Sequence, residues 1–151
     1  MIKDIFKSET IADLAQRIES IKESDTPHWG VMTSAQMMAH LNVMFKMGYD
    51  EDVKKAPKFV QFMLRKLVKP KVAGSKPYGK NGKTDPSMKI TSHPDFSEEK
   101  SNLLNNLSQV KQNGRSFFEG REHPGFGKMT SQEWNTTFYK HLIHHLNQFG
   151  A

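Results

Sequence analysis

The stretch Thr130–Gln148, TSQEWNTTFYKHLIHHLNQ, decides the fold class, because it predicts a long amphipathic helix near the end of the chain. Thr130 and Glu133 have the spacing of a capping box, in which each side chain accepts a hydrogen bond from a free backbone N–H at the helix start. At about 100° per residue, one arc of this helix carries five residues: Trp134, Phe138, His141, His145 and Gln148. We expect this arc to face the core.

Four further helices are predicted upstream from apolar spacings of three and four and from capping signals. Their expected ranges are 8–23, 33–48, 57–70 and 97–113. The second of them begins with another capping-box pair, Thr33 and Gln36. No apolar and polar alternation of strand length and no internal repeat occurs. The sequence therefore predicts an all-α fold with a four-helix core, an additional short helix and long loops at 70–96 and 114–129.

The helix at 57–70 is expected to begin at Pro57, which a first turn tolerates, and to stop at Pro70. Its inward residues are expected to be Phe59, Val60, Met63, Leu64 and Leu67. The helix that follows is expected to end at Asn113-Gly114, because glycine readily adopts the left-handed conformation that terminates helices.

The composition limits the classes of site that the chain can build. Its 151 residues suit one domain, 1–151, and contain no cysteine. Disulfides, thiolate zinc sites and thiol nucleophiles are therefore excluded, so any metal must be held by His, Asp or Glu. No run of about 18 apolar residues predicts a membrane span, and the first residues lack the apolar core of a secretory signal. We expect a cytoplasmic location.

The net charge of +6 is concentrated in one segment, 54–89. Eleven of the 22 Lys and Arg residues lie there, against a single acid, Asp85, whereas the other 115 residues hold eleven bases and fifteen acids. A solvated basic face is the favoured interpretation. An anionic partner could also dock on this segment, although aromatic residues suited to base stacking are scarce, which argues against nucleic acid.

Three histidines are expected on inward helix faces. His141 and His145 project within about 40° of each other, and His40 shares an arc with methionines 37, 44 and 47. Two histidines one turn apart and a third on a distant helix could hold a divalent cation and leave positions open on it. The alternative is a buried polar network of histidines in a bundle that only supports an oligomer.

The final helix, with His141, His145 and Gln148, resembles the H-x-x-x-H-x-x-Q signature of the DinB/YfiT-like superfamily, which includes bacterial thiol-dependent S-transferases. The stretch WGVMTSAQMMAH, 29–40, resembles the beginning of that superfamily's second helix. HPGFGKMT, 123–130, is similar to one uncharacterised subfamily. These matches lie in the same order along the chain and cover both ends of the expected bundle.

The resemblance implies an up-down-down-up four-helix bundle with a divalent metal held by His40, His141 and His145. The metal in such relatives is commonly nickel, zinc or iron, and three imidazoles do not distinguish among them. Bundles of this kind often form homodimers, although no dimer face is evident in the sequence. Four further side chains are candidates to contact a ligand histidine or the substrate: Gln36, Gln148, His123 and His144.

Two functions follow as expectations. The first is a metal-dependent hydrolase or small-thiol S-transferase acting on an unidentified small molecule, with the ion serving as a Lewis acid or binding a water or thiolate. The second is a non-catalytic helical module whose segment 54–89 docks an anionic partner. No individual catalytic residue is indicated by the sequence.

Overall fold

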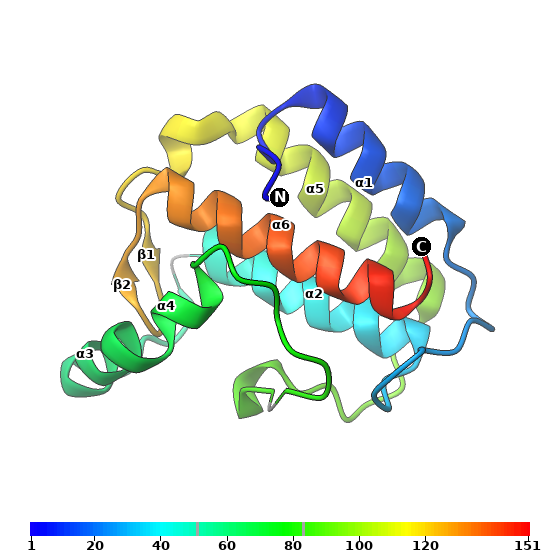
Figure 1. The fold of residues 1–151 in the computed structure, drawn as a ribbon, viewed down its shortest axis with the longest axis horizontal. Coiled ribbons are helices and arrows are strands. Elements are labelled where there is room, and N and C mark those ends of the chain that lie inside the picture. Colours follow the sequence, from blue (N-terminus) through cyan, green and yellow to red (C-terminus); the bar gives the residue numbers. More distant parts are fainter. Residues whose placement is uncertain (51, 83) are drawn as a thin grey trace.

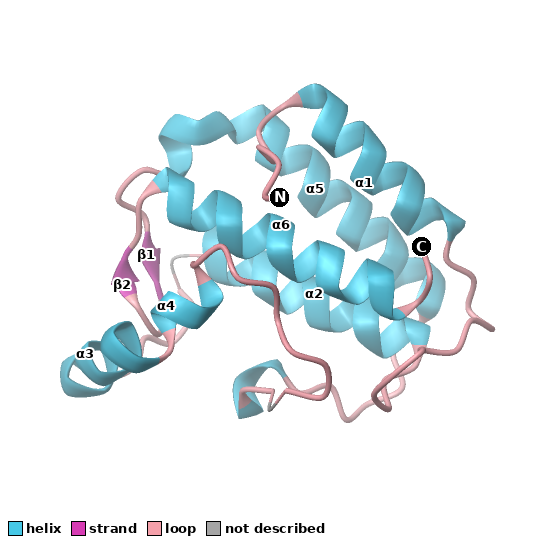
Figure 2. Cartoon of the chain, in the orientation of Figure 1, coloured by secondary structure: helices cyan, strands magenta, loops and turns pink. Residues whose placement is uncertain are grey.

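The computed structural model describes residues 1–50, 52–82 and 84–151, and the chain is mostly helical (Figures 1 and 2). The longer helices are α1 (Ser8–Ser20), α2 (Ser34–Tyr49), α5 (Phe96–Phe118) and α6 (Ser131–Gln148). The shorter elements are α3 (Lys58–Leu67), α4 (Lys69–Val72), a 3-10 turn η1 (Pro86–Met88), and the strands β1 (Glu122–His123) and β2 (Gly127–Lys128). No helix in the described ranges combines the length and apolar character needed to cross a membrane.

The four longer helices pack side by side around one apolar core. In Figure 1, α1 and α6 run in one direction across the view and α2 and α5 run in the other. Aromatic rings fill the centre of this core, with centroids 5.0–6.1 Å apart among Phe45, Phe118, Trp134 and Phe138. The all-α prediction is therefore confirmed, and α2 and α6, which carry the three inward histidines, lie against each other.

Both predicted capping boxes are present. The Thr33 hydroxyl accepts from the Gln36 N–H while the Gln36 side chain accepts from the Thr33 N–H, and Thr130 and Glu133 repeat the arrangement at the start of α6. Each box satisfies N–H groups that have no partner within the helix. The starts of the two histidine-bearing helices are thus fixed by local sequence.

The prediction for the helix at 57–70 is wrong about which residues face inward. Phe59 is 75% exposed and Leu67 is 62% exposed, and of the five expected inward residues only Leu64 packs against the core. The polar Gln61 is buried instead and donates to the Pro124 carbonyl. The helix lies beside the hairpin at one end of the molecule, so most of its apolar stripe has no core to meet (Figure 1).

Two predicted helix ends also differ from the structure. Pro70 does not end helical structure, because it occupies a first-turn position in α4, where a missing N–H costs nothing. Gly114 breaks the helix as expected, with φ 68° and ψ 177°, but helical residues resume and continue to Phe118. The predicted loop 114–129 therefore contains a helical turn and the two-stranded hairpin β1–β2.

Arg121 fastens this hairpin to the end of α2. Its guanidinium donates to the carbonyls of Gly48 and Tyr49. These carbonyls lie in the last turn of α2, where the helix itself offers them no N–H donor. A cation at a helix C-terminus also meets the negative end of the helix dipole. The hairpin and the carboxyl end of α2 are thereby held together.

Candidate metal centre

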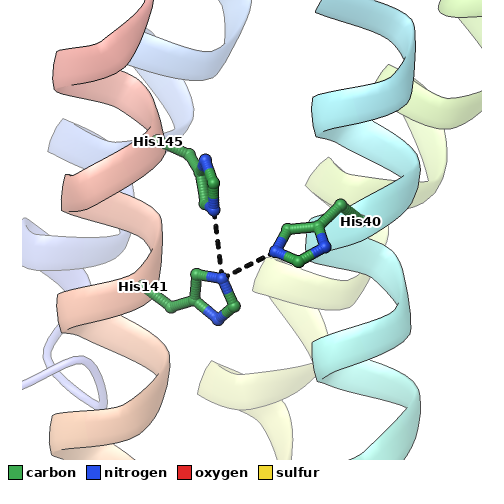
Figure 3. A group of neighbouring side chains, drawn as sticks. All are labelled: His40, His141 and His145. Carbon is green, nitrogen blue, oxygen red and sulfur yellow. Dashed lines mark hydrogen bonds between the residues drawn. The ribbon is translucent and has the colours of Figure 1, made fainter. Parts of the chain in front are cut away.

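The three predicted ligand histidines converge on one point between α2 and α6 (Figure 3). His40 Nε2 lies 2.9 Å from His141 Nε2, which lies 3.1 Å from His145 Nε2. One ligand atom from each residue falls within 4.8 Å of the others, so the group could hold a metal ion. His141 and His145 are one turn apart on α6, and packing of α2 brings in His40.

Hydrogen bonds at the far side of two rings fix which nitrogen carries the proton. His40 Nδ1 lies 2.8 Å from the Met88 carbonyl, an acceptor, so Nδ1 must be the donor. His145 Nδ1 lies 2.7 Å from Gln148 Oε1, while Gln148 Nε2 donates to the Trp29 carbonyl. Both rings therefore present an unprotonated Nε2 to the centre of the cluster.

Burial keeps the cluster neutral. Loss of solvent lowers the pKa of His40, and it lowers the pKa of His145 to about 3 with a further contribution from His40. Burial and the neighbouring imidazoles hold the pKa of His141 well below its ordinary value. Neutral imidazoles are the form that binds metals, so at neutral pH the cluster needs no net loss of protons to bind an ion.

The donor set fits a divalent cation. Three nitrogens bound at about 2.0–2.1 Å to one ion, with about 90–110° between bonds, lie about 2.8–3.4 Å apart. Two of the three separations, 2.9 and 3.1 Å, fall in this range, and the three ligand atoms all lie within 4.8 Å of one another. His141 Nε2 can donate a proton to only one of the two lone pairs that face it, whereas a cation would satisfy all three nitrogens at once.

The Tyr78 side chain covers one side of the histidine cluster. The Tyr78 ring meets the rings of His141 and His144 edge-on, with centroids 5.7 and 5.6 Å away. Burial raises the pKa of Tyr78, so its phenol is neutral, and its hydroxyl donates to the Val72 carbonyl. Tyr78 was not among the sequence candidates, since a single tyrosine within a long irregular segment carries no periodic signal.

A cavity of about 260 Å³ lies beside Tyr78. Trp29, Tyr78, Lys80 and His144 contribute to its lining. The Trp29 indole N–H is buried and has no hydrogen-bond partner among the described residues, and Lys80 Nζ lies 4.5 Å from the centroid of the same ring. A polar ligand atom could satisfy this donor.

A family model described as "Protein of unknown function (DUF1569)" matches residues 6–151. The chain belongs to the DUF1569 family. No curated protein and no solved structure matches it. The matched range of this DUF1569 chain includes all three clustered histidines and both helices that carry them.

The other candidate residues of this DUF1569 chain have separate positions. Gln148 contacts His145 directly, and His144 touches Trp29, Tyr78 and the His145 ring without joining the three converging nitrogens. Gln36 acts in the capping box and donates to the Ser92 carbonyl. Of the four, Gln148 is thus the side chain hydrogen-bonded to a clustered histidine.

His123 of this DUF1569 chain serves the hairpin turn. Its Nδ1 accepts from the N–H groups of Gly125 and Phe126, and its ring stacks on Phe126 with centroids 4.3 Å apart. These contacts hold His123 in the turn, and it is not among the three converging histidines. Burial, with the nearby charge of Lys69, lowers the pKa of His123 to about 4.

We expect stability to depend on pH through His123. Its folded pKa of about 4 lies below the unfolded value of 6.5, so falling pH protonates the unfolded chain first. This contribution is fully present above pH 6.5 and is lost as pH falls toward 4; it amounts to about 2 kcal/mol between pH 7.5 and 5.

Urea denaturation of wild type and His123→Asn at both pH values tests this dependence. Asparagine offers an acceptor oxygen to the same N–H groups but does not titrate. The free energy of unfolding should fall by about 2 kcal/mol less in the variant. Equal falls in the two proteins would show that His123 is not the group responsible.

Proposed function

We propose that this DUF1569 protein binds one divalent metal ion through His40, His141 and His145 and is a metal-dependent hydrolase or small-thiol S-transferase. The observation that carries the proposal is the convergence of three neutral Nε2 atoms, two of them fixed as lone-pair donors by Met88 and Gln148. A buried network of histidines without a metal needs one N–H donor for each nitrogen lone pair. At the centre of this cluster two Nε2 lone pairs face a single nitrogen that can donate, so one lone pair is left without a donor.

We also propose that the chain is a DinB-like up-down-down-up four-helix bundle. The order and directions of α1, α2, α5 and α6 support this architecture, as does the placement of one histidine on α2 and two on α6 (Figure 1). The resemblance of the two histidine-bearing helices to DinB-like motifs supports it independently. Superposition of an experimental structure on DinB-like bundles tests it, and a different helix order or pairing would contradict it.

An ion with three protein ligands and open positions supplies Lewis acidity and lowers the pKa of a water or thiol that binds it. The chain's own residues prepare the surroundings. Gln148 orients His145, and the Met88 carbonyl orients His40. Tyr78 packs against His141 on one side of the cluster. The cavity beside Tyr78 is lined by His144 but by none of the three converging histidines, and it offers room for a small molecule near the cluster.

Metal analysis of protein purified without a histidine tag tests the binding step. After reconstitution with nickel, zinc or iron in turn and removal of excess ion, we expect about one equivalent per chain for the preferred metal. A content near zero for every metal would overturn the proposal. Competition among the three ions then identifies the metal, which an all-imidazole set does not specify.

Spectroscopy of the cobalt-loaded protein separates the two reaction classes. A small thiol that binds as a thiolate should add a sulfur-to-metal charge-transfer band, and His141→Ala should lack it. No spectral change at saturating thiol would contradict the S-transferase reading. Hydrolysis of ester or amide substrates by the loaded wild type, absent in His141→Ala, would then support the hydrolase.

Gln148→Ala should weaken metal binding by about 10–100-fold, because His145 would lose the partner that fixes its orientation and proton position. Titration with a competing chelator measures the change. Gln36→Ala is the matched control: it removes one hydrogen bond of the capping box and the bond to the Ser92 carbonyl, and should cost about 1 kcal/mol of stability without changing metal affinity. Equal affinities in the Gln148 variant and wild type would contradict the orienting role.

A further inference from the structure

Helix α3, which lies at one end of the molecule (Figure 1), carries a cluster of exposed apolar side chains. Six of the nine large hydrophobic residues that are exposed in the described structure lie within ten positions: Phe59, Val60, Phe62, Met63, Leu67 and Val68. Scattered exposed apolar residues are ordinary, but a cluster of this kind marks an interaction surface.

The attachment of α3 leaves this surface free. The Ala56 N–H and the Gln61 side chain both bond to the Pro124 carbonyl, and Lys69, just after the helix, pairs with Glu133 at 2.7 Å. These contacts lie on the side that faces the hairpin and α6. Phe59, Met63 and Leu67 fall on another arc of the helix, because they are spaced four residues apart.

Positive charge flanks the apolar arc. Lys58, Arg65 and Lys66 lie on the neighbouring arc of α3, and no acid occurs in the sequence between 54 and 84. Within the described ranges, no ion pair engages Arg65 or Lys66. Lys83, which belongs to the predicted basic segment 54–89, lies outside the described residues.

We propose that α3 docks on the surface of an anionic lipid bilayer. The apolar arc of Phe59, Met63 and Leu67 enters the region between headgroups and acyl chains, while Arg65 and Lys66 meet lipid phosphates. Amphipathic helices with lysine or arginine beside an apolar face bind bilayers in this way, lying in the interface without crossing it.

Charge and hydrophobicity together favour a bilayer over other partners. A symmetric contact between two copies of α3 would place like charges against each other. A nucleic acid backbone would match the charges but would leave the aliphatic Met63 and Leu67 without an apolar partner. An anionic bilayer satisfies both features, and the proposal is independent of whether the histidine cluster binds metal.

Co-sedimentation of the full chain with lipid vesicles tests the proposal. We expect binding to phosphatidylcholine vesicles that contain about 30 mol% phosphatidylserine, weaker binding to phosphatidylcholine alone, and a decline as ionic strength rises above about 0.15 M. Absence of binding to the anionic vesicles at low salt would overturn the proposal. Equal binding to both vesicle types would also overturn it, because the charges would then have no role.

Two double variants separate the contributions of charge and apolar surface. Arg65→Glu/Lys66→Glu should weaken vesicle binding by at least about thirty-fold, since loss of each cation near an anionic surface costs about five-fold and the two glutamates are repelled by it. Phe59→Ser/Leu67→Ser should weaken it by at least about tenfold. All four residues are exposed, so folding should be retained. Lys7→Glu/Lys111→Glu changes net charge equally and is the control, because Lys7 lies exposed just before α1 and Lys111 lies exposed on α5.

Further measurements identify competing occupants. Phe59→Trp should add fluorescence that brominated lipids quench, beyond any quenching of Trp29 and Trp134 in wild type.

A concentration-dependent dimer that Phe59→Ser/Leu67→Ser dissociates, without vesicle binding by wild type, would assign the face to a second copy. DNA binding that survives this substitution, again without vesicle binding, would assign the basic residues to nucleic acid. Either result would overturn the bilayer proposal.

Discussion

His141→Ala should abolish stoichiometric metal binding, with a loss of affinity of at least about a hundredfold. His141 lies between the other two histidines, with its Nε2 2.9 Å from His40 Nε2 and 3.1 Å from His145 Nε2. Its removal therefore takes away one of the three ligands, and that ligand is the one that lies close to both of the others. Changes to residues that only orient ligands cost about 10–100-fold, and loss of the ligand itself should exceed that range.

Metal content and thermal or urea stability measure this effect together. At a free metal concentration about 100 times the wild-type Kd, binding should add about 2.7 kcal/mol to wild-type stability but about 0.4 kcal/mol to a variant with hundredfold weaker binding. His144→Ala is the control, because His144 is adjacent on α6 but does not join the converging nitrogens. Unchanged metal content in His141→Ala would contradict the assigned ligand set.

Phe118→Ala should reduce the free energy of unfolding by about 3–5 kcal/mol, the range for truncating a fully buried aromatic ring. Phe118 has no exposed surface and packs against five other rings. Its centroid lies between 5.0 and 6.1 Å from those of Phe6, Tyr49, Phe117, Trp134 and Phe138. Urea denaturation monitored by circular dichroism measures the loss.

Phe117→Ala provides the matched comparison for Phe118→Ala. Phe117 is 37% exposed and meets the Arg121 guanidinium at 4.2 Å from its ring centroid. Its truncation should cost about 1 kcal/mol, because less apolar surface is lost and no large cavity forms. Equal destabilisation of the two variants would show that the segment after Gly114 does not pack as the structure indicates.

The position of Phe118 also illustrates why part of the fold could not be predicted from the sequence. Gly114 ends regular helix geometry, and the short run that follows has too few residues to show a period. The segment was therefore predicted to be a loop. Its helical turn is held by packing of Phe118 against rings from the residues before α1, from α2 and from α6, which local sequence does not reveal.

Helix α3 shows a second limit. Its apolar period was sufficient to predict a helix near 58–67, because periodicity reports the geometry of the helix itself. The same period indicates that the helix has an apolar side. It does not indicate whether another part of the chain packs against that side. Exposure of Phe59 and Leu67 followed only from the placement of the helix beside the hairpin.

The sequence alone determined the starts of α2 and α6 and the shared face of His141 and His145, because capping and one-turn spacing depend on residues a few positions apart. Only the tertiary structure decided that His40 lies against His141, which is 101 positions away in the sequence. It also decided that Met88 and Gln148 orient two of the three imidazole rings and that Tyr78 covers the cluster. These contacts depend on how separate helices and loops pack, which is set by burial of the whole core.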